Sequence, residues 1–144
     1  MDDHDAPARV RALPSWMLNR VAARASRIVA DRTAELGATR TTYSMLAALE
    51  EFGPASQADL GRRLGLDRKD VSSIIGVLDR DGLVHRIVDP SDSRRRRIEI
   101  TPSGLVLLER LAQAIELAQD DLLGALSIRD RAELARILAA LDGR

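Results

Sequence analysis

Apolar residues recur at steps of three and four along most of this 144-residue chain, the spacing of helices with one buried face. The first such stripe runs from Pro14 to Leu36, and Gly37 can end the helix. A second helix is predicted from near Thr42 to the Gly53-Pro54 pair. Four of its residues are expected to face inward: Met45, Leu46, Leu49 and Phe52.

Two shorter helices follow, and a capping pattern precedes each of them. Residues 56–59 read Ser-Gln-Ala-Asp, a variant of the capping box, and the helix they begin ends at Gly65. Residues 67–70 read Asp-Arg-Lys-Asp and repeat the pattern before a fourth helix that Gly82 closes. The predicted buried stripe of this fourth helix is Val71, Ile74, Ile75 and Leu78.

The period then changes to two, which predicts a β-hairpin. Leu83 to Val88 is rich in branched residues, and residues 89–92, Asp-Pro-Ser-Asp, have turn chemistry. In the returning strand, Arg96, Ile98 and Ile100 alternate with Arg95, Arg97 and Glu99, so one face is apolar. Four consecutive arginines, Arg94 to Arg97, therefore lie at or after the tip of the hairpin.

Helical periodicity resumes after the hairpin. Thr101-Pro102 is an N-cap followed by proline at the first helical position, and this long helix reaches about Gly124. Ser127 caps a last helix. Residues 1–12 are polar and aperiodic, which predicts a flexible tail. The predicted fold is thus mainly α, with about six helices and one small hairpin.

Composition excludes several classes of function. The chain has no cysteine and only two histidines, His4 and His85, so a thiolate zinc site or a multi-histidine metal site is not expected. It also lacks a glycine-rich phosphate loop and a Ser-His-Asp arrangement. We therefore expect no catalytic residue, no metal and no cofactor. No apolar run has the length of a membrane span, which predicts a soluble, cytoplasmic protein without a membrane partner.

The basic and acidic residues are unevenly distributed along the chain, and this bears on whether the protein binds nucleic acid. The net charge is zero, which argues against a nucleic-acid partner. Residues 56–100, however, carry ten basic and eight acidic groups, whereas residues 101–144 carry five and seven. The sign of this weak polarisation fits a middle segment that meets an anion.

Residues 56–101 combine a short helix, a tight turn, a second helix and a hairpin, the order of a winged helix-turn-helix. Such a unit docks its second helix in the DNA major groove, and an arginine at the hairpin tip can enter the minor groove. The outward face of the second helix holds Arg68, Lys69, Ser72, Ser73 and Gly76. The candidate DNA-binding residues are Ser56, Arg68, Lys69, Ser72, Ser73, Arg94, Arg95 and Arg96.

Three other interpretations remain open. The second helix would have a polar face as an ordinary amphipathic surface helix. The arginine run would discourage aggregation as the solvated edge of a strand. The whole winged helix could also bind a protein partner without recognising DNA.

Residues 56–104 resemble the winged helix of the MarR (multiple antibiotic resistance regulator) family of transcription regulators. The hairpin signature of that family is roughly Asp-Pro-x-Asp-x-Arg, followed by a strand and Leu-Thr-x-x-Gly. The chain has Asp-Pro-Ser-Asp-Ser-Arg at residues 89–94 and Ile-Thr-Pro-Ser-Gly at residues 100–104, where Ile100 replaces the usual leucine. The order of elements resembles the family over about residues 14–142.

This resemblance implies a homodimer that binds a pseudo-palindromic DNA operator and in most members represses transcription. Residues 13–55 and 102–144 would form the dimerisation region, and residues 56–101 would bind DNA. Arg94 would be the wing-tip arginine that enters the minor groove, and Asp92 would brace it. Many members release DNA when a small aromatic or phenolic acid binds between the two regions.

An anionic aromatic ligand requires a cation, an aromatic or apolar wall and a hydrogen-bond donor. The candidate ligand-binding residues are Trp16, Arg20, Tyr43 and His85. Each has an alternative role. Trp16 and Tyr43 would pack in the core or a dimer interface, Arg20 would form a surface salt bridge, and His85 would face solvent or a satisfied partner.

Overall fold

The computed structural model describes residues 6–144, which form two compact units. The central unit comprises residues 33–114, and the terminal unit comprises the described residues up to 32 together with residues 115–144. Residues 1–5, including His4 and the start of the expected tail, lie outside the described residues. Within residues 6–144, no helix is both long and apolar enough to cross a membrane.

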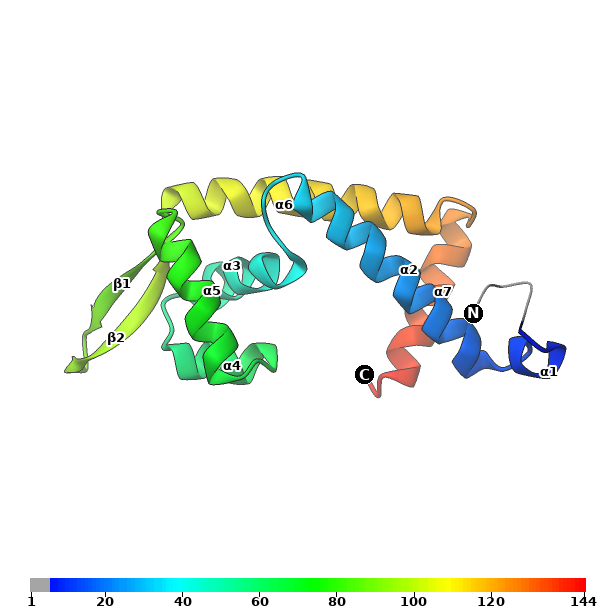
Figure 1. Ribbon diagram of the computed structural model, residues 1–144, viewed down its shortest axis with the longest axis horizontal. Coiled ribbons are helices and arrows are strands. Elements are labelled where there is room, and N and C mark those ends of the chain that lie inside the picture. The colour runs from blue at the N-terminus through cyan, green and yellow to red at the C-terminus, as the bar shows by residue number, and fades with distance from the viewer. Residues whose placement is uncertain (1–5) are drawn as a thin grey trace. The chain divides into compact units, whose positions relative to one another are not determined.

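The order of elements is the predicted one: a mainly helical chain with a single two-stranded hairpin (Figure 1). The central unit contains α3 (Arg40–Phe52), α4 (Gln57–Leu64), α5 (Arg68–Arg80), β1 (Val84–Asp89), β2 (Asp92–Ile100) and the first part of α6 (Pro102–Leu123). The terminal unit contains α1 (Ala8–Arg11), most of α2 (Pro14–Ala34), the end of α6 and α7 (Ile128–Leu141). The described residues form seven helices, one more than the roughly six predicted. The additional helix is α1, a single turn within the segment that was expected to be a tail.

Side-chain caps set where the helices begin. The Ser56 hydroxyl accepts from the backbone N–H of Asp59 at 3.1 Å, and the Asp67 carboxylate accepts from that of Asp70 at 2.8 Å. Helix α3 begins at Arg40, two residues before the predicted start near Thr42. Thr39 is the N-cap, and Thr42 is the third helical residue, bonded back to Thr39 in a complete capping box.

The core of the central unit is aliphatic and draws on every element of that unit. Its buried residues are Met45, Leu46, Ala48, Leu49, Ala55, Leu60, Val71, Ile75, Leu78, Val84, Ile98, Leu108 and Leu111. Helix α3 therefore packs with the winged helix, whereas the family resemblance implies that it belongs with the first helix in the dimerisation region. The inward placement of Phe52 was wrong. The residue is 51% exposed at the end of α3, where the guanidinium of Arg63 covers the ring at 4.1 Å.

The hairpin projects from the ends of α5 and α6 (Figure 1). Its strands are antiparallel, and the buried side of β2 carries Ile98 opposite Arg86. The segment before α4 adds a short bridge that sequence reasoning missed. Ala55 and Ile98 exchange two backbone hydrogen bonds, of 3.1 and 2.7 Å, so the wing is tied to the start of the helix-turn-helix.

Thr101 and Gly104 join the base of the hairpin to α5 and α6. The Thr101 hydroxyl donates to the carbonyl of Gly82 at 2.7 Å and accepts from the N–H of Gly104 at 3.0 Å. The Thr101 N–H donates to the carbonyl of Leu83 at 3.1 Å. A Cβ on Gly104 would lie 2.1 Å from that same carbonyl oxygen, so only glycine fits there.

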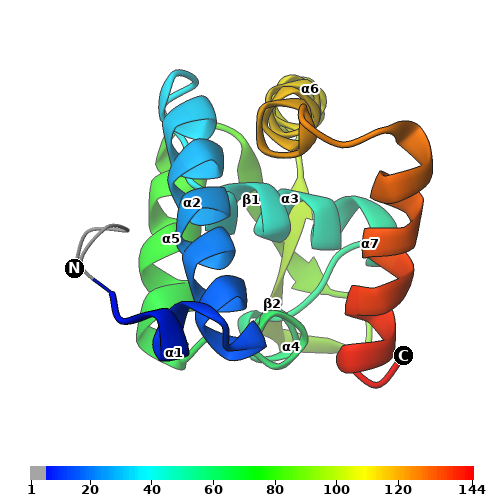
Figure 2. The same ribbon diagram turned by 90° about the vertical axis from the view of Figure 1, so that its right-hand side faces the viewer.

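Ion pairs link the helices of the terminal unit. Arg32 of α2 donates to Asp121 of α6 at 2.6 and 3.1 Å. The adjacent Asp120 accepts from Arg131 of α7 at 2.9 Å. Figure 2 shows the loop of residues 124–127 that turns the chain from α6 into α7. Neighbouring carboxylates on α6 thus face two different helices.

We expect Gly104→Ala to destabilise the protein, because its methyl group would force the base of the wing away from α6 at a cost of roughly 1–3 kcal/mol. Gly76→Ala is the matched control: a Cβ there meets nothing within 4 Å, and alanine is the better helix former by about 0.5–1 kcal/mol. Urea unfolding followed by circular dichroism measures both. Equal effects of the two substitutions would contradict the close approach at Gly104.

Candidate nucleic-acid interface

The first half of α5 presents the polar face that the sequence predicts. Arg68, Lys69, Ser72 and Ser73 are all exposed and line one open hollow of about 560 Å³. The opposite face of α5 is buried through Val71, Ile75 and Leu78. The four outward side chains take no part in the core, so their hydrogen-bonding groups are available to a partner.

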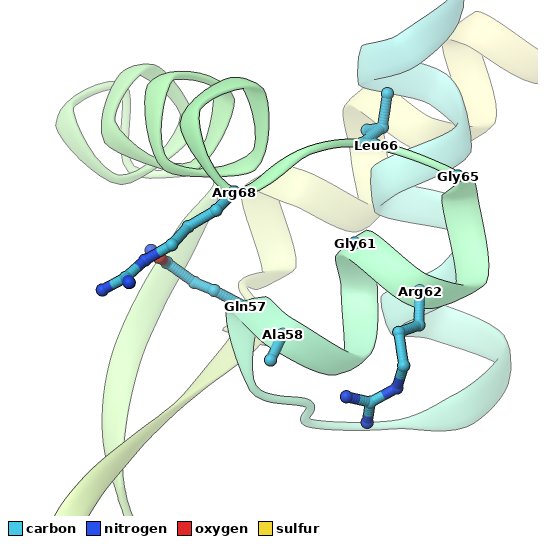
Figure 3. Close-up of a pocket in the computed structure, with 7 residues that line it drawn as sticks. All are labelled: Gln57, Ala58, Gly61, Arg62, Gly65, Leu66 and Arg68. Carbon is cyan, nitrogen blue, oxygen red and sulfur yellow. The ribbon is translucent and has the colours of Figure 1, made fainter.

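A second hollow, of about 620 Å³, lies where α4 turns into α5 (Figure 3). Its walls include Gln57 at the first turn of α4 and Arg68 at the first turn of α5, whose side chains extend toward one another (Figure 3). The turn and α5 both approach α4 closely at Gly61, where an added Cβ would lie 3.0 Å from the carbonyl oxygen of Leu66 in the turn and 3.4 Å from Cγ2 of Val71 on α5. Gln57 was absent from the predicted site, and its position at the start of the helix-turn-helix was the only signal for it.

Ser56, a predicted DNA-binding residue, serves the backbone in this structure. It caps α4, and its hydrogen bond is the main reason that the pKa of Asp59 is lowered. Asp59 in turn pairs with Arg62, which also lines the second hollow. The Ser56 hydroxyl therefore supports α4, and one of the nearby arginines already has a carboxylate partner.

The register of the hairpin divides the four arginines. Val88 pairs with Arg96, but the next residue, Asp89, pairs with Asp92, so Ser93, Arg94 and Arg95 have no partner in β1. Arg97 pairs with Ile87 farther from the tip. The sequence predicts that Arg95 belongs to the returning strand, and it does lie in β2. It shares the bulge with Arg94, however, because the ladder skips three residues of β2.

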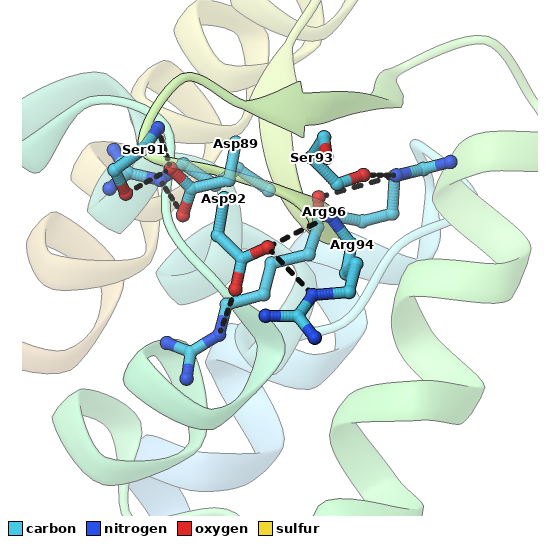
Figure 4. A network of polar contacts seen from close by, with 8 residues as sticks. Asp89, Ser91, Asp92, Ser93, Arg94 and Arg96 are labelled. Atoms are coloured by element: carbon cyan, nitrogen blue, oxygen red, sulfur yellow. Dashed lines mark hydrogen bonds and ion pairs between the residues drawn. The ribbon is translucent and has the colours of Figure 1, made fainter.

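Asp92 lies beneath this bulge and binds it in three ways (Figure 4). Its Oδ1 accepts from the backbone N–H of Arg94 at 3.0 Å and lies 3.4 Å from Nε of the same residue. Its Oδ2 lies 3.6 Å from Nε of Arg95. The side chain of Arg94 is nevertheless 90% exposed, so this contact orients the guanidinium without burying it.

Asp89 binds a different set of groups at the start of the turn (Figure 4). Its Oδ1 accepts from the backbone N–H and the hydroxyl of Ser91 at 2.8 and 2.7 Å, and its Oδ2 accepts from Nε of Arg97 at 3.0 Å. The two hydrogen bonds from Ser91, with a further contribution from Arg97, lower the pKa of Asp89 to about 2. This carboxylate and Arg97 were not among the predicted site residues.

Arg96 curls back over the tip. Its Nη1 donates to the backbone carbonyls of Ser93 and Arg95 at 3.2 and 3.3 Å (Figure 4). These carbonyls belong to the bulge, which has no ladder bonds of its own to satisfy them. Arg96 therefore contributes to the shape of the tip as well as to its charge.

The four predicted ligand-binding residues lie on three elements: Trp16 and Arg20 on α2, Tyr43 on α3 and His85 on β1. In the terminal unit, the guanidinium of Arg20 covers the ring of Trp16 at 4.7 Å. In the central unit, Tyr43 packs against the core, and His85 of β1 lies 3.1 Å from the carboxylate of Glu99 across the hairpin. Residues 6–144 contain no cluster of histidine and acidic side chains able to hold a metal ion.

A sequence model of the MarR family matches residues 36–95, which extend from the end of α2 to the wing tip. The chain belongs to the MarR family. The predicted membership of this family is thereby confirmed. The winged-helix fold and the prediction that the chain is not an enzyme are confirmed as well.

Three relatives are similar to this chain over about two thirds of its length or more. A protein described as a transcriptional regulator of the hcr operon of Thauera aromatica is 30% identical over 105 residues, 73% of this chain and 63% of that protein. The repressor NicR of Pseudomonas putida is 29% identical over 100 residues, 69% of this chain and 63% of the repressor. The activatory protein BadR of Rhodopseudomonas palustris is 36% identical over 98 residues, 65% of this chain and 56% of that protein. The chain thus matches less than two thirds of the length of these relatives.

Among solved structures, a probable transcriptional regulator from Pseudomonas aeruginosa superimposes with a TM-score of 0.77 and 29% identity. The match covers 91% of this chain and 98% of that protein. The likeness therefore extends beyond the winged helix to the flanking helices.

Proposed function

We propose that this chain is a dimeric, sequence-specific DNA-binding transcription regulator that acts in the cytoplasm. The observation that carries the proposal is the exposed arginine bulge at the wing tip, on the same unit as the polar face of α5. Helix α5 would enter the major groove of an operator half-site, and Arg94 would enter the adjacent minor groove.

The two elements would read DNA by different means. Arg68 and Lys69 at the first turn of α5 would contact guanine acceptors or phosphates, and Ser72 and Ser73 would contact bases or phosphates with less selectivity. Arg94 and Arg95 would respond to the width and negative potential of the minor groove. Gln57 would add a backbone contact beside Arg68.

We further propose that the bound protein represses transcription. A winged helix seated on an operator blocks access to that DNA by occupancy alone, whereas activation requires an additional surface that contacts the transcription machinery. The relatives include one named a repressor and one named an activatory protein, so they support regulation in either direction.

We expect Arg94→Ala to weaken binding to duplex DNA and to flatten its dependence on salt. The slope of log K against log salt should decrease in magnitude by about 0.9, because the variant would make one fewer phosphate contact and binding would release fewer counterions. Fluorescence anisotropy with a labelled random-sequence duplex measures this. Arg144→Ala is the matched control, since it removes an arginine that pairs with Asp142 outside the winged helix.

The same salt series separates DNA binding from the rival function. A winged helix that binds only proteins would show no affinity for duplex DNA even at low salt. Absence of binding by the unaltered protein would refute the proposed function and favour the protein-contact interpretation.

The dimeric state is proposed from the apolar surface of the terminal unit. Its large exposed apolar side chains are Leu13, Met17, Leu18, Val21, Leu117, Ile128, Ile137, Leu138 and Leu141. No apolar side chain of α7 is fully buried within the chain, although the helix carries an apolar stripe. Single exposed apolar residues are ordinary, but several on each of two helices are typical of an association surface.

We expect the double variant Ile137→Asp with Leu141→Asp to be monomeric and to bind DNA more weakly, since it would place two charges in the interface and uncouple the two half-sites. Light scattering after gel filtration should give twice the 15.8 kDa chain mass for the unaltered protein. The control Ala132→Asp changes the opposite face of α7 and should stay dimeric. A monomeric unaltered protein would contradict the proposal.

A ligand that relieves repression is proposed from the pair formed by Trp16 and Arg20. An aromatic acid could stack on the indole ring and place its carboxylate on the guanidinium, thereby using both the wall and the cation. The alternative is that the pair serves only to stabilise α2. His85 supports the ligand less well, because it already has Glu99 as a partner.

We expect salicylate, used as the probe, to change Trp16 fluorescence saturably and to reduce DNA binding in the same concentration range. Arg20→Ala should weaken both effects at least about tenfold, which is the loss of one ion pair in a partly desolvated site. Arg129→Ala, an exposed arginine on α7, should leave both unchanged. The absence of a saturable change with salicylate and related phenolic acids would end the ligand proposal.

A further inference from the structure

The arginines of the wing occupy two distinct environments. The side chains of Arg94 and Arg95 are 90% and 77% exposed, whereas that of Arg97 is 39% exposed and bound to a carboxylate that is itself 10% exposed. A run of four identical residues therefore does not act as one cationic patch.

We propose that Asp89, Ser91 and Arg97 form a clasp that positions the wing tip for DNA. In this clasp Arg97 binds Asp89 and not DNA, and Asp89 is a positioning residue for Arg94 and Arg95. The proposal rests on the proposed function and adds to it the way in which the tip is held.

The register of the hairpin explains why such a clasp is needed. The ladder between β1 and β2 is interrupted between Val88 and Asp89, and Ser93, Arg94 and Arg95 lie outside it. A three-residue bulge has no regular backbone bonds to define its conformation. The clasp spans this interruption, since it joins the first residue of the turn, the turn itself and a residue of β2 eight positions later.

The contacts of Asp89 leave its two oxygens fully engaged. Oδ1 receives both donors of Ser91, and Oδ2 receives Nε of Arg97. The carboxylate form is favoured by all three donors, and the lowered pKa of Asp89, about 2, agrees with this geometry. A carboxyl whose pKa is depressed on folding contributes stability above its unfolded value near 3.8, and that contribution is lost as the pH falls toward 2.

Asp89 is also the residue for which positioning and simple electrostatics predict opposite results. It adds negative charge close to a surface that is proposed to bind a polyanion. If only charge mattered, Asp89→Asn would tighten binding to DNA. If the clasp positions the tip, the same substitution weakens binding. The NH₂ group of the asparagine is a donor, and in either orientation it would face another donor, the backbone N–H of Ser91 or Nε of Arg97.

The test measures duplex binding across a salt series for Asp89→Asn, Arg97→Gln and the double variant. Each single substitution should weaken binding roughly threefold or more, within the range of couplings between contacting residues. The double variant should lose little more than either single one. The salt slope of Arg97→Gln should remain that of the unaltered protein, whereas Arg94→Ala reduces it.

A charge-neutral variant keeps the test independent of electrostatics and of gross unfolding. Ser91→Ala removes one donor from Asp89 without changing the net charge, and it should weaken binding with an unchanged salt slope. Ser103→Ala, an exposed serine in the first turn of α6, is its control and should bind normally. Thermal unfolding by circular dichroism confirms that each variant is folded at the assay temperature.

The outcomes are distinguishable. Tighter or equal binding by Asp89→Asn overturns the clasp, as does a reduced salt slope for Arg97→Gln, which would show that Arg97 contacts phosphate itself. In both cases the unaltered protein still binds DNA, so the proposed function stands. Failure of the unaltered protein to bind DNA would instead overturn the proposed function and the clasp with it.

Discussion

The geometry of the central unit depends on the contact between Thr101, Gly104 and the end of α5. A single hydroxyl bonds the last turn after α5 to the first turn of α6, and the absence of a side chain at Gly104 lets the two segments touch. Both ends of the hairpin are thereby held at one point. Without it, the wing could rotate relative to α5, and the two elements proposed to contact adjacent grooves would have no common frame.

Carboxylates explain how a chain of zero net charge can present a cationic surface. In the central unit, Asp59 pairs with Arg62, Asp79 with Arg86, and Asp89 with Arg97. The first pair lies within α4, the second joins α5 to β1, and the third joins β1 to β2, so each neutralises one cation while it supports local structure. The side chains of Arg94 and Arg95 at the wing tip remain 90% and 77% exposed, and Arg68 and Lys69 of α5 are exposed as well. The relevant quantity for binding an anion is therefore the distribution of exposed charge and not the net charge of the chain.

Local patterns account for most of the agreement between sequence and structure. Ser56, Asp67, Thr101 and Ser127 were recognised as caps because capping depends on neighbours within four residues. Phe52 was misplaced because its position satisfies the helical period, yet α3 ends there and the ring meets Arg63 of the next helix. The missing ladder partner of Arg95 was not predicted, because strand alternation assumes an unbroken ladder and nothing local shows where a ladder skips residues.

The sequence by itself determined the main elements, their order, most of the buried faces of α3 to α5 and the family signature of the wing, because each of these depends on periodicity, turn chemistry and caps within a short stretch of chain. The tertiary structure alone decided which polar side chains are used internally. Arg97 lies eight residues from Asp89, and Ala55 lies 43 residues from Ile98, so neither partner is encoded by spacing. Both contacts arise only when the strands pair in one particular register, and that register is set by the packing of Ile98 into the core.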